Sequence, residues 1–150
     1  MSSRDRPDGA IPLSISQMLG LIPFTRHLGI RLIEAGPAGE TIFHLPFDTR
    51  VIGNLMLPAV HGGVLASFME AAALTTVYAM ENQDRLPKLV DFSIDYLSSA
   101  GPHDLYSTCE ILRQGKRIAA VGIRCWQRDR NAPVTLGRAH ILFAQPAAES

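Results

Sequence analysis

A nearly unbroken apolar segment at residues 64–80 constrains the fold of this chain more than any other feature. As a helix of about 19 residues it would extend about 28 Å. Glu70 is the only charged residue between His61 and Met80. Because a helix that is apolar on nearly all sides must be buried, we expect it in the middle of the protein, with the rest of the chain folded around it.

The residues before this helix predict one short helix and two strands. Residues 14–27 have apolar positions at helical spacing, and Pro23 is expected to bend or end that helix. Residues 29–34 and 40–45 are typical of strands that flank a Gly-Pro-Ala-Gly turn. Residues 47–59 contain proline and glycine without a clear period, so we predict a loop there.

Four segments with strand-like patterns follow the helix, separated by turn signals. They are residues 90–96, 105–113, 117–128 and 135–143. Spacing this regular predicts a meander of antiparallel strands. The compact arrangement of all these elements is an α+β fold, in which a curved antiparallel sheet is wrapped around one long central helix.

Length and charge narrow the possible functions. The chain has 150 residues, with 14 Lys+Arg and 14 Asp+Glu, so its formal net charge is zero. The length predicts a single domain over residues 1–150, with flexible ends at 1–10 and 145–150. A balanced charge argues against a dedicated nucleic-acid or anionic-membrane partner.

The cysteines and the apolar runs indicate the cellular compartment in which we expect the protein. Cys109 and Cys125 lack the spacing of a zinc site, so we predict no metal centre and two free thiols in a reducing environment. No uninterrupted apolar run reaches the roughly 20 residues of a membrane span. The first residues do not resemble a signal peptide, so we expect a cytoplasmic protein.

Glu70 is the first candidate for chemistry, because burying a lone carboxylate is unfavourable unless it is paired, hydrogen-bonded or protonated. One interpretation pairs it with an arginine or a backbone donor. Another puts it on a surface stripe with Ser67. The functional interpretation is a general base or a nucleophile whose pKa is raised.

The sequence His61-Gly62-Gly63 at the start of the helix is the second candidate. The first amides of a helix have no intrahelical partner and lie at the positive end of its dipole. Two glycines let a ligand approach this backbone closely, which suits an anion or a developing oxyanion. The alternative interpretation is a tight turn before a helix.

The spacing of these two candidates has a consequence for assembly. Gly62 and Glu70 are eight residues apart, which is about 12 Å along one helix. They can act on one reacting carbon only if two copies of the helix pack antiparallel. If they act together, the protein must therefore be at least a dimer with two sites across its interface.

Three segments carry a family resemblance. LPAVHGGVLASFMEAAAL contains HGG, six mostly apolar residues and then Glu70, while DFSIDYLSSA and ILRQGKRIAAVGIRCWQ follow as a strand and a hairpin. Together they resemble the hotdog-fold acyl-CoA thioesterases, in particular the phenylacetyl-CoA thioesterase-like group. The resemblance covers about residues 27–145.

The resemblance implies hydrolysis of acyl-CoA to a free acid and CoA without a metal or organic cofactor. In it, the Gly62 amide polarises the thioester carbonyl, and Glu70 of the facing subunit activates water or attacks directly. His61 holds the thioester region or helps the oxyanion site. Asn54 resembles the residue that helps to place the acyl carbonyl or the water.

The resemblance also suggests where the coenzyme binds and how the chain assembles. Arg113, Lys116 and Arg117 cluster at one hairpin turn, where they could contact phosphates together with the backbone of Gly63. A solvated hairpin tip is the other interpretation of this cluster. A homodimer is implied, and beyond it a homotetramer.

Leu89 departs from the family pattern, since many relatives have Ser or Thr there to hold the water. This departure keeps a second function open, a non-catalytic module that binds or senses acyl-CoA. A hotdog hydratase is a third. Aromatic and medium-chain acyl groups are both compatible with the sequence.

Overall fold

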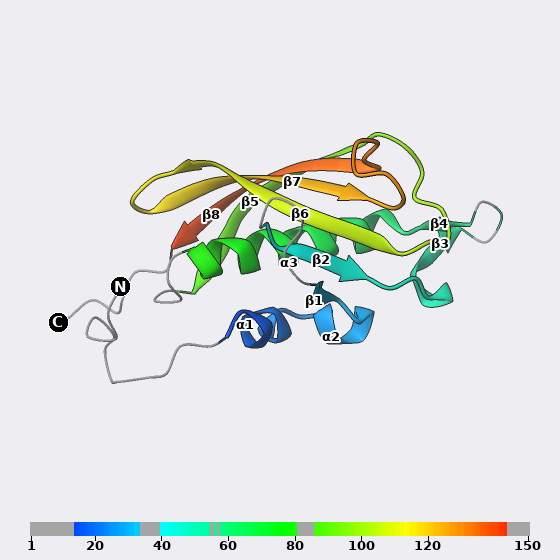
Figure 1. The fold of residues 1–150 in the computed structure, drawn as a ribbon, viewed down its shortest axis with the longest axis horizontal. Helices are drawn as coiled ribbons and strands as arrows, with labels where there is room; N and C mark the ends of the chain where they lie inside the picture. The colour runs from blue at the N-terminus through cyan, green and yellow to red at the C-terminus, as the bar shows by residue number, and fades with distance from the viewer. Residues whose placement is uncertain (1–13, 34–39, 55, 57, 81–85, 144–150) are drawn as a thin grey trace.

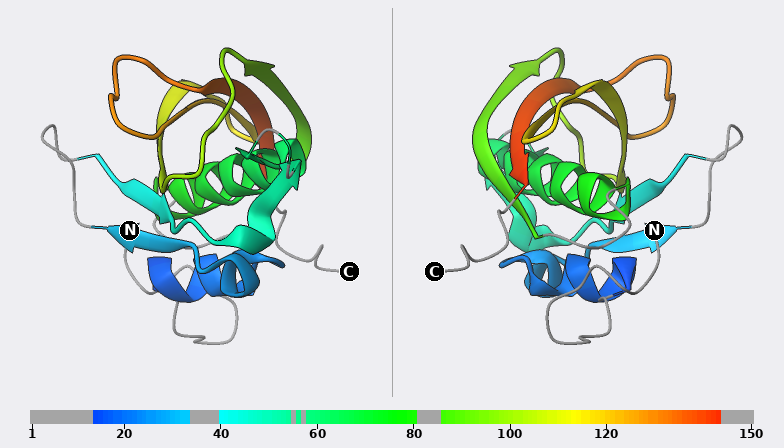
Figure 2. Two further views of the ribbon diagram at one scale, coloured as in Figure 1. Left: turned by 90° about the vertical axis from the view of Figure 1, so that its right-hand side faces the viewer. Right: turned by 90° about the vertical axis from the view of Figure 1, so that its left-hand side faces the viewer.

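The long helix α3, Gly62–Met80, lies under an arched antiparallel sheet of six strands (Figures 1 and 2). The computed structural model describes residues 14–33, 40–54, 56, 58–80 and 86–143. The sheet consists of β1 (Arg31–Ile33), β2 (Ile42–Leu45), β5 (Pro87–Tyr96), β6 (Leu105–Gln114), β7 (Ile118–Trp126) and β8 (Thr135–Phe143). This arrangement confirms the predicted sheet wrapped around a central helix.

The core lies between α3 and the concave face of the sheet. Side chains of β7 alternate, so that Val121 and Ile123 are buried while Arg124 is exposed. Phe68 and Met69 of α3 are fully buried, as the apolar pattern of the helix predicted. α3 is long and apolar enough to cross a membrane, and its place as the core helix accounts for both properties.

The predicted meander is correct for β6, β7 and β8 but wrong for β5. The strand order is β1-β2-β6-β7-β8-β5, so β5 pairs with β8 and forms an edge of the sheet. The physical reason is that both sides of β6 are occupied, because β2 pairs with one side and β7 with the other. Within the described part of the chain, β5 therefore has one unpaired edge, on the side of the sheet next to α3 (Figure 2).

Two short helices replace the single predicted helix at 14–27. α1 (Ile15–Leu21) begins with a capping box made by Ser14 and Gln17, and α2 (Thr25–Leu28) follows after a turn that contains Pro23. α1 packs on the side of α3 away from the sheet (Figure 1). The predicted turn at 36–39 and the predicted flexible ends lie outside the described residues.

The predicted loop at 47–59 contains secondary structure that the sequence pattern did not reveal. A 3-10 turn, Thr49–Val51, leads into β3 (Ile52–Asn54), which pairs with β4 (Ala59–Val60). The pairing is irregular between Ile52 and Asn54. Strands of two or three residues with an irregular register are too short to produce a visible alternation.

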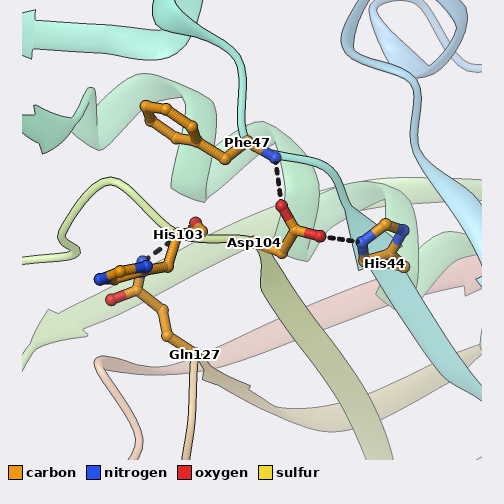
Figure 3. A network of polar contacts seen from close by, with 5 residues as sticks. All are labelled: His44, Phe47, His103, Asp104 and Gln127. Atoms are coloured by element: carbon orange, nitrogen blue, oxygen red, sulfur yellow. Dashed lines mark hydrogen bonds and ion pairs between the residues drawn. The ribbon is translucent and has the colours of Figure 1, made fainter.

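Polar contacts fix the connection between β5 and β6 (Figure 3). Asp104 accepts a hydrogen bond from the Phe47 amide at 2.7 Å and contacts Nε2 of His44 at 2.8 Å. Both contacts lower the pKa of the Asp104 carboxyl, and the hydrogen bond from the Phe47 amide has the larger effect. Gln127 Nε2 donates to the carbonyl of His103 at 3.2 Å. The connection is thereby attached both to β2 and to the residue after β7.

Candidate active site

The start of α3 is held in place by backbone contacts with neighbouring segments. The amide of Val60 donates to the carbonyl of Ala100 at 2.8 Å, and the amide of His61 donates to the carbonyl of Val51 at 2.8 Å. The chain therefore enters the helix along β4 in a fixed direction. His61 is the residue that immediately precedes the helix.

His61 caps the helix with both its carbonyl and its ring. Its carbonyl accepts hydrogen bonds from the amides of Val64 and Leu65, at 2.9 and 3.2 Å. Its Nδ1 accepts a hydrogen bond from the amide of Gly63 at 2.9 Å. The amide of Gly63 is therefore occupied, and the neutral His61 ring carries its proton on Nε2.

The amide of Gly62 differs from the other amides of this first turn, because it is not engaged in a hydrogen bond with any described residue. Within the part of the chain that the structure describes, its N–H has no acceptor. It lies at the positive end of a 19-residue helix. A free N–H at such a position is suited to hydrogen-bond a carbonyl oxygen that becomes negatively charged.

Tyr96, at the end of β5, also contacts the helix start, and the sequence analysis did not single it out. Its hydroxyl donates to the carbonyl of Gly62 at 3.0 Å. A Cβ atom added to Gly62 would lie 3.1 Å from this hydroxyl, which explains why glycine fits here. The alternation of Phe92, Ile94 and Tyr96 could have placed this ring on the helix side of the sheet.

Glu70 lies on a partly exposed stripe of a helix that is otherwise largely buried. Gly63, Ser67, Glu70 and Leu74 recur at spacings of three and four residues, so they share one side of α3. None of these four is classed as buried, whereas their neighbours Phe68 and Met69 are fully covered. The interpretation that paired Glu70 with Ser67 on one stripe matches this placement.

The carboxylate of Glu70 has no hydrogen-bond or ion-pair partner among the described residues. The alternative of a partner arginine or backbone donor therefore has no support in this part of the chain. Burial raises the pKa of the Glu70 carboxyl above its usual value. A partly buried, unpaired carboxylate is costly for stability, which makes it a candidate for function.

Gly62 and Glu70 do not meet within one chain. They are eight residues apart on a continuous helix, so about 12 Å separates them along its axis. The structure brings Gly62 together with His61 and Tyr96, and leaves Glu70 facing outward on the stripe described above. A site that uses both Gly62 and Glu70 needs a second copy of the helix.

The remaining predicted site residues belong to β3 and to the β6–β7 hairpin. The backbone of Asn54 belongs to β3 and pairs with Ala59, whereas its side chain lies outside the described residues. Arg113, Lys116 and Arg117 are exposed at the β6–β7 hairpin, at the opposite end of α3 from its start (Figure 1). One chain therefore does not bring these cations to the Gly62 amide.

Other arginines that could bind phosphate are engaged in holding the β7–β8 connection. Arg130 pairs with Glu40, and its guanidinium lies 5.2 Å from the ring centre of Trp126. Arg124 donates to the carbonyl of Arg130 at 3.2 Å. These contacts give both arginines a structural role on the outer face of the sheet.

The described residues include no group of three or more His, Cys, Asp or Glu side chains that could hold a metal ion. Both cysteines are unpaired thiols, as predicted, and burial raises the pKa of each to about 12. Leu89 packs against the hydrophobic core, opposite Ile141 of β8. A hydroxyl that would hold water is therefore missing at this point of β5.

Comparison with known proteins gives one family. The family model of the thioesterase superfamily matches residues 57–134, just over half of the chain. The medium/long-chain acyl-CoA thioesterase YigI of Salmonella typhimurium is 28% identical in an alignment that covers 73% of this chain and 78% of that protein. The matched region of the family model includes the whole of α3.

Solved structures have the same fold. A Chromobacterium violaceum protein is 38% identical, with a TM-score of 0.70 over 87% of this chain and 90% of that one. A protein described as a member of the thioesterase superfamily is 28% identical, with a TM-score of 0.77 over 87% of this chain and 96% of that one. Both similarities extend over α3 and the sheet because they cover most of each chain.

Proposed function

Because the chain belongs to the thioesterase superfamily, we propose that it hydrolyses acyl-CoA thioesters at a site shared between two subunits. The predicted family, its hotdog fold and the enzyme class of thioesterase are confirmed. The observation that carries the proposed mechanism is the free amide of Gly62 at the positive end of α3. The unpaired carboxylate of Glu70 on the same helix supplies the second group.

In this proposal the Gly62 N–H donates a hydrogen bond to the carbonyl oxygen of the thioester. The bond strengthens as water adds to the carbonyl carbon, because negative charge then develops on that oxygen. The Nε2–H of His61 lies on the neighbouring residue and would help to hold the thioester. No metal is required to polarise the carbonyl.

Glu70 of the facing subunit acts on the other side of the carbonyl. As a general base it takes one proton from water while the oxygen attacks carbon; the C–S bond then breaks, and the CoA sulfur leaves as a thiol after protonation. As a nucleophile its carboxylate oxygen would bond to the acyl carbon while the C–S bond breaks and CoA leaves as a thiolate that then takes up a proton; water cleaves the resulting anhydride and restores the carboxylate. Both routes give the free acid and CoA and need an ionised Glu70.

The free edge of β5 supports the shared site. Among the described residues, β5 is a ten-residue strand that pairs on one side only, and such an edge is a template for pairing with a second strand. Antiparallel pairing of two β5 edges would produce a two-fold axis beside α3. The same axis makes the two copies of α3 antiparallel, so that Gly62 of each subunit faces the helix side that carries Glu70 of the other.

The same two-fold arrangement gives the hairpin cations a role. Arg113, Lys116 and Arg117 lie far from Gly62 in their own subunit, but the axis moves the hairpin of one subunit toward the α3 start of the other. We propose these three side chains as contacts for the phosphates of CoA. Asn54 and the backbone of Gly63 would complete the binding region. A homotetramer would be two such dimers.

The acyl group is proposed from the relatives. The Salmonella typhimurium relative is described as a medium/long-chain acyl-CoA thioesterase, so we expect medium-chain esters to be hydrolysed faster than short ones. The reaction would take place in the cytoplasm, where the buried thiols Cys109 and Cys125 remain reduced.

A panel of acyl-CoAs tests this function. We expect wild-type protein to release CoA thiol and free acid from at least one of acetyl-, octanoyl-, palmitoyl- and phenylacetyl-CoA, measured with a thiol reagent and by mass spectrometry. An enoyl-CoA included in the panel detects a hydratase, which would add water without releasing thiol. Binding of all esters without thiol release would instead favour the non-catalytic binding module.

The pH dependence of the reaction follows from the raised pKa of Glu70. The reaction needs the ionised carboxylate, so activity falls as the pH drops through that pKa. We therefore expect the acid limb of kcat/KM to have its midpoint above 4.5, the usual value for this group. A profile that stays flat down to pH 4.5 would contradict the assignment.

A further inference from the structure

The peptide bond between Gly62 and Gly63 is hydrogen-bonded at both ends. Its carbonyl oxygen accepts the hydroxyl of Tyr96 at 3.0 Å, and its N–H donates to Nδ1 of His61 at 2.9 Å. The three groups form one chain of hydrogen bonds, from the phenol through the peptide to the imidazole. Successive hydrogen bonds polarise one another, so the phenol strengthens the bond that reaches the ring.

We propose that Tyr96 is a positioning residue, whose hydroxyl acts through the Gly62–Gly63 peptide to hold His61 as an Nε2–H donor beside the free amide of Gly62. An imidazole whose Nδ1 accepts a hydrogen bond has its proton on Nε2 when neutral. His61 then offers a second N–H to the thioester carbonyl. The consequence for catalysis rests on the function proposed above.

The surroundings of Tyr96 support this role over a purely structural one. The residue is 54% exposed, so its ring contributes little to the core although it lies at the end of a core strand. By contrast, Tyr106 on β6 is packed between His44 and Trp126. The Tyr96 ring therefore lies at the helix start, next to the groups that meet the substrate, on the strand that we propose to pair with the second subunit.

The position of the His61 ring is fixed from its other side as well. A Cβ atom on Gly53 of β3 would lie 3.0 Å from Cδ2 of His61, a tight contact, so the strand passes close to the ring. His61 is exposed, but its ring lies against the backbone of β3 on one side and the first turn of α3 on the other. These contacts orient the ring, and the hydrogen-bond chain from Tyr96 determines which nitrogen carries the proton.

The test compares Tyr96→Phe with wild type and with the matched control Tyr106→Phe. In substrate-free protein labelled with ¹⁵N histidine, we expect His61 to show a protonated Nε2 and an unprotonated Nδ1, assigned by the loss of the signal in His61→Gln. In Tyr96→Phe the Nδ1–H form should increase. With octanoyl-CoA, kcat should fall on the order of tenfold, less than when an oxyanion donor itself is removed, and KM should stay within about twofold.

Several results would overturn the proposal. A wild-type ring protonated on Nδ1 contradicts the hydrogen-bond chain. A tautomer ratio in Tyr96→Phe that equals the wild-type ratio shows that the phenol does not act through the peptide. A changed ratio with unchanged kcat shows that the tautomer is irrelevant to the reaction. If wild type releases no thiol from any ester, the proposed function fails, while the tautomer measurement still decides the hydrogen-bond chain.

Discussion

Replacing Gly62 with proline is expected to lower kcat by about 10²–10³-fold, the usual cost of removing one oxyanion donor. Proline lacks the N–H that we assign to the thioester carbonyl. It is also favoured at the first position of a helix, where the missing N–H would have no intrahelical partner. Gly62 occupies that first position, so α3 should still form. Thiol release from octanoyl-CoA measures the effect.

Gly62→Ala is the matched control. Both substitutions add a Cβ atom, which would lie 3.1 Å from the Tyr96 hydroxyl and force it to shift by a few tenths of an ångström. Only proline removes the amide hydrogen. We expect alanine to retain most of the activity that proline abolishes. Equal kcat values for the two variants would mean that the Gly62 N–H does not stabilise the transition state.

Glu70→Gln is expected to lower kcat by on the order of a hundredfold or more, as for the loss of a positioned base. Glutamine keeps the size of the side chain but cannot accept a proton or form an anhydride. Glu70→Asp keeps the carboxylate on a shorter arm and should retain measurable activity. Activity of the glutamine variant within about threefold of wild type would remove Glu70 from the mechanism, since base catalysis supplies far more.

Glu70→Gln should be at least as stable to thermal unfolding as the wild-type protein. Glu70 is partly buried, and among the described residues nothing compensates its charge. A neutral amide removes the cost of burying that charge, so we expect a Tm equal to or above that of wild type. Thermal unfolding of Glu70→Gln at pH 7 therefore separates a functional carboxylate from a structural one.

The central helix and its chemistry could be predicted from the sequence because they depend on local rules. The apolar run made a buried helix necessary, and the rise of that helix fixed the distance between Gly62 and Glu70. The two glycines at its start marked the turn in which the Gly62 amide is free and the Gly63 amide is bound by His61. The family resemblance rested on the same residues, and the match of residues 57–134 confirms it.

The order of the strands could not be predicted in the same way. β5 precedes β6 in the sequence but pairs with β8, about fifty residues away in several of its contacts, such as Asp91 with His140. Alternation identifies a strand and its two faces but does not name its neighbour. The short strands β3 and β4 left no periodic signal at all, so the region that supports His61 was predicted to be a loop.

Polar contacts between residues far apart in the chain also could not be predicted from the sequence. The pairing of Arg130 with Glu40, ninety residues earlier in the chain, gives this arginine a structural role that its place in the sequence does not indicate. In the sequence, Tyr96 is only one residue of a strand motif. Its hydrogen bond to Gly62 depends on where β5 ends relative to the start of α3.

Mixing Gly62→Pro with Glu70→Gln tests the shared site most directly. If each site combines Gly62 of one subunit with Glu70 of the other, a mixed dimer of the two inactive variants contains one intact site and one doubly defective site. With random pairing, half of the dimers are mixed, so about one quarter of the wild-type activity should return. Co-expression with two affinity tags isolates the mixed dimers, which should have about one half of the wild-type activity because one of their two sites is intact. Mixed dimers that are no more active than either variant alone would contradict a site built across two subunits.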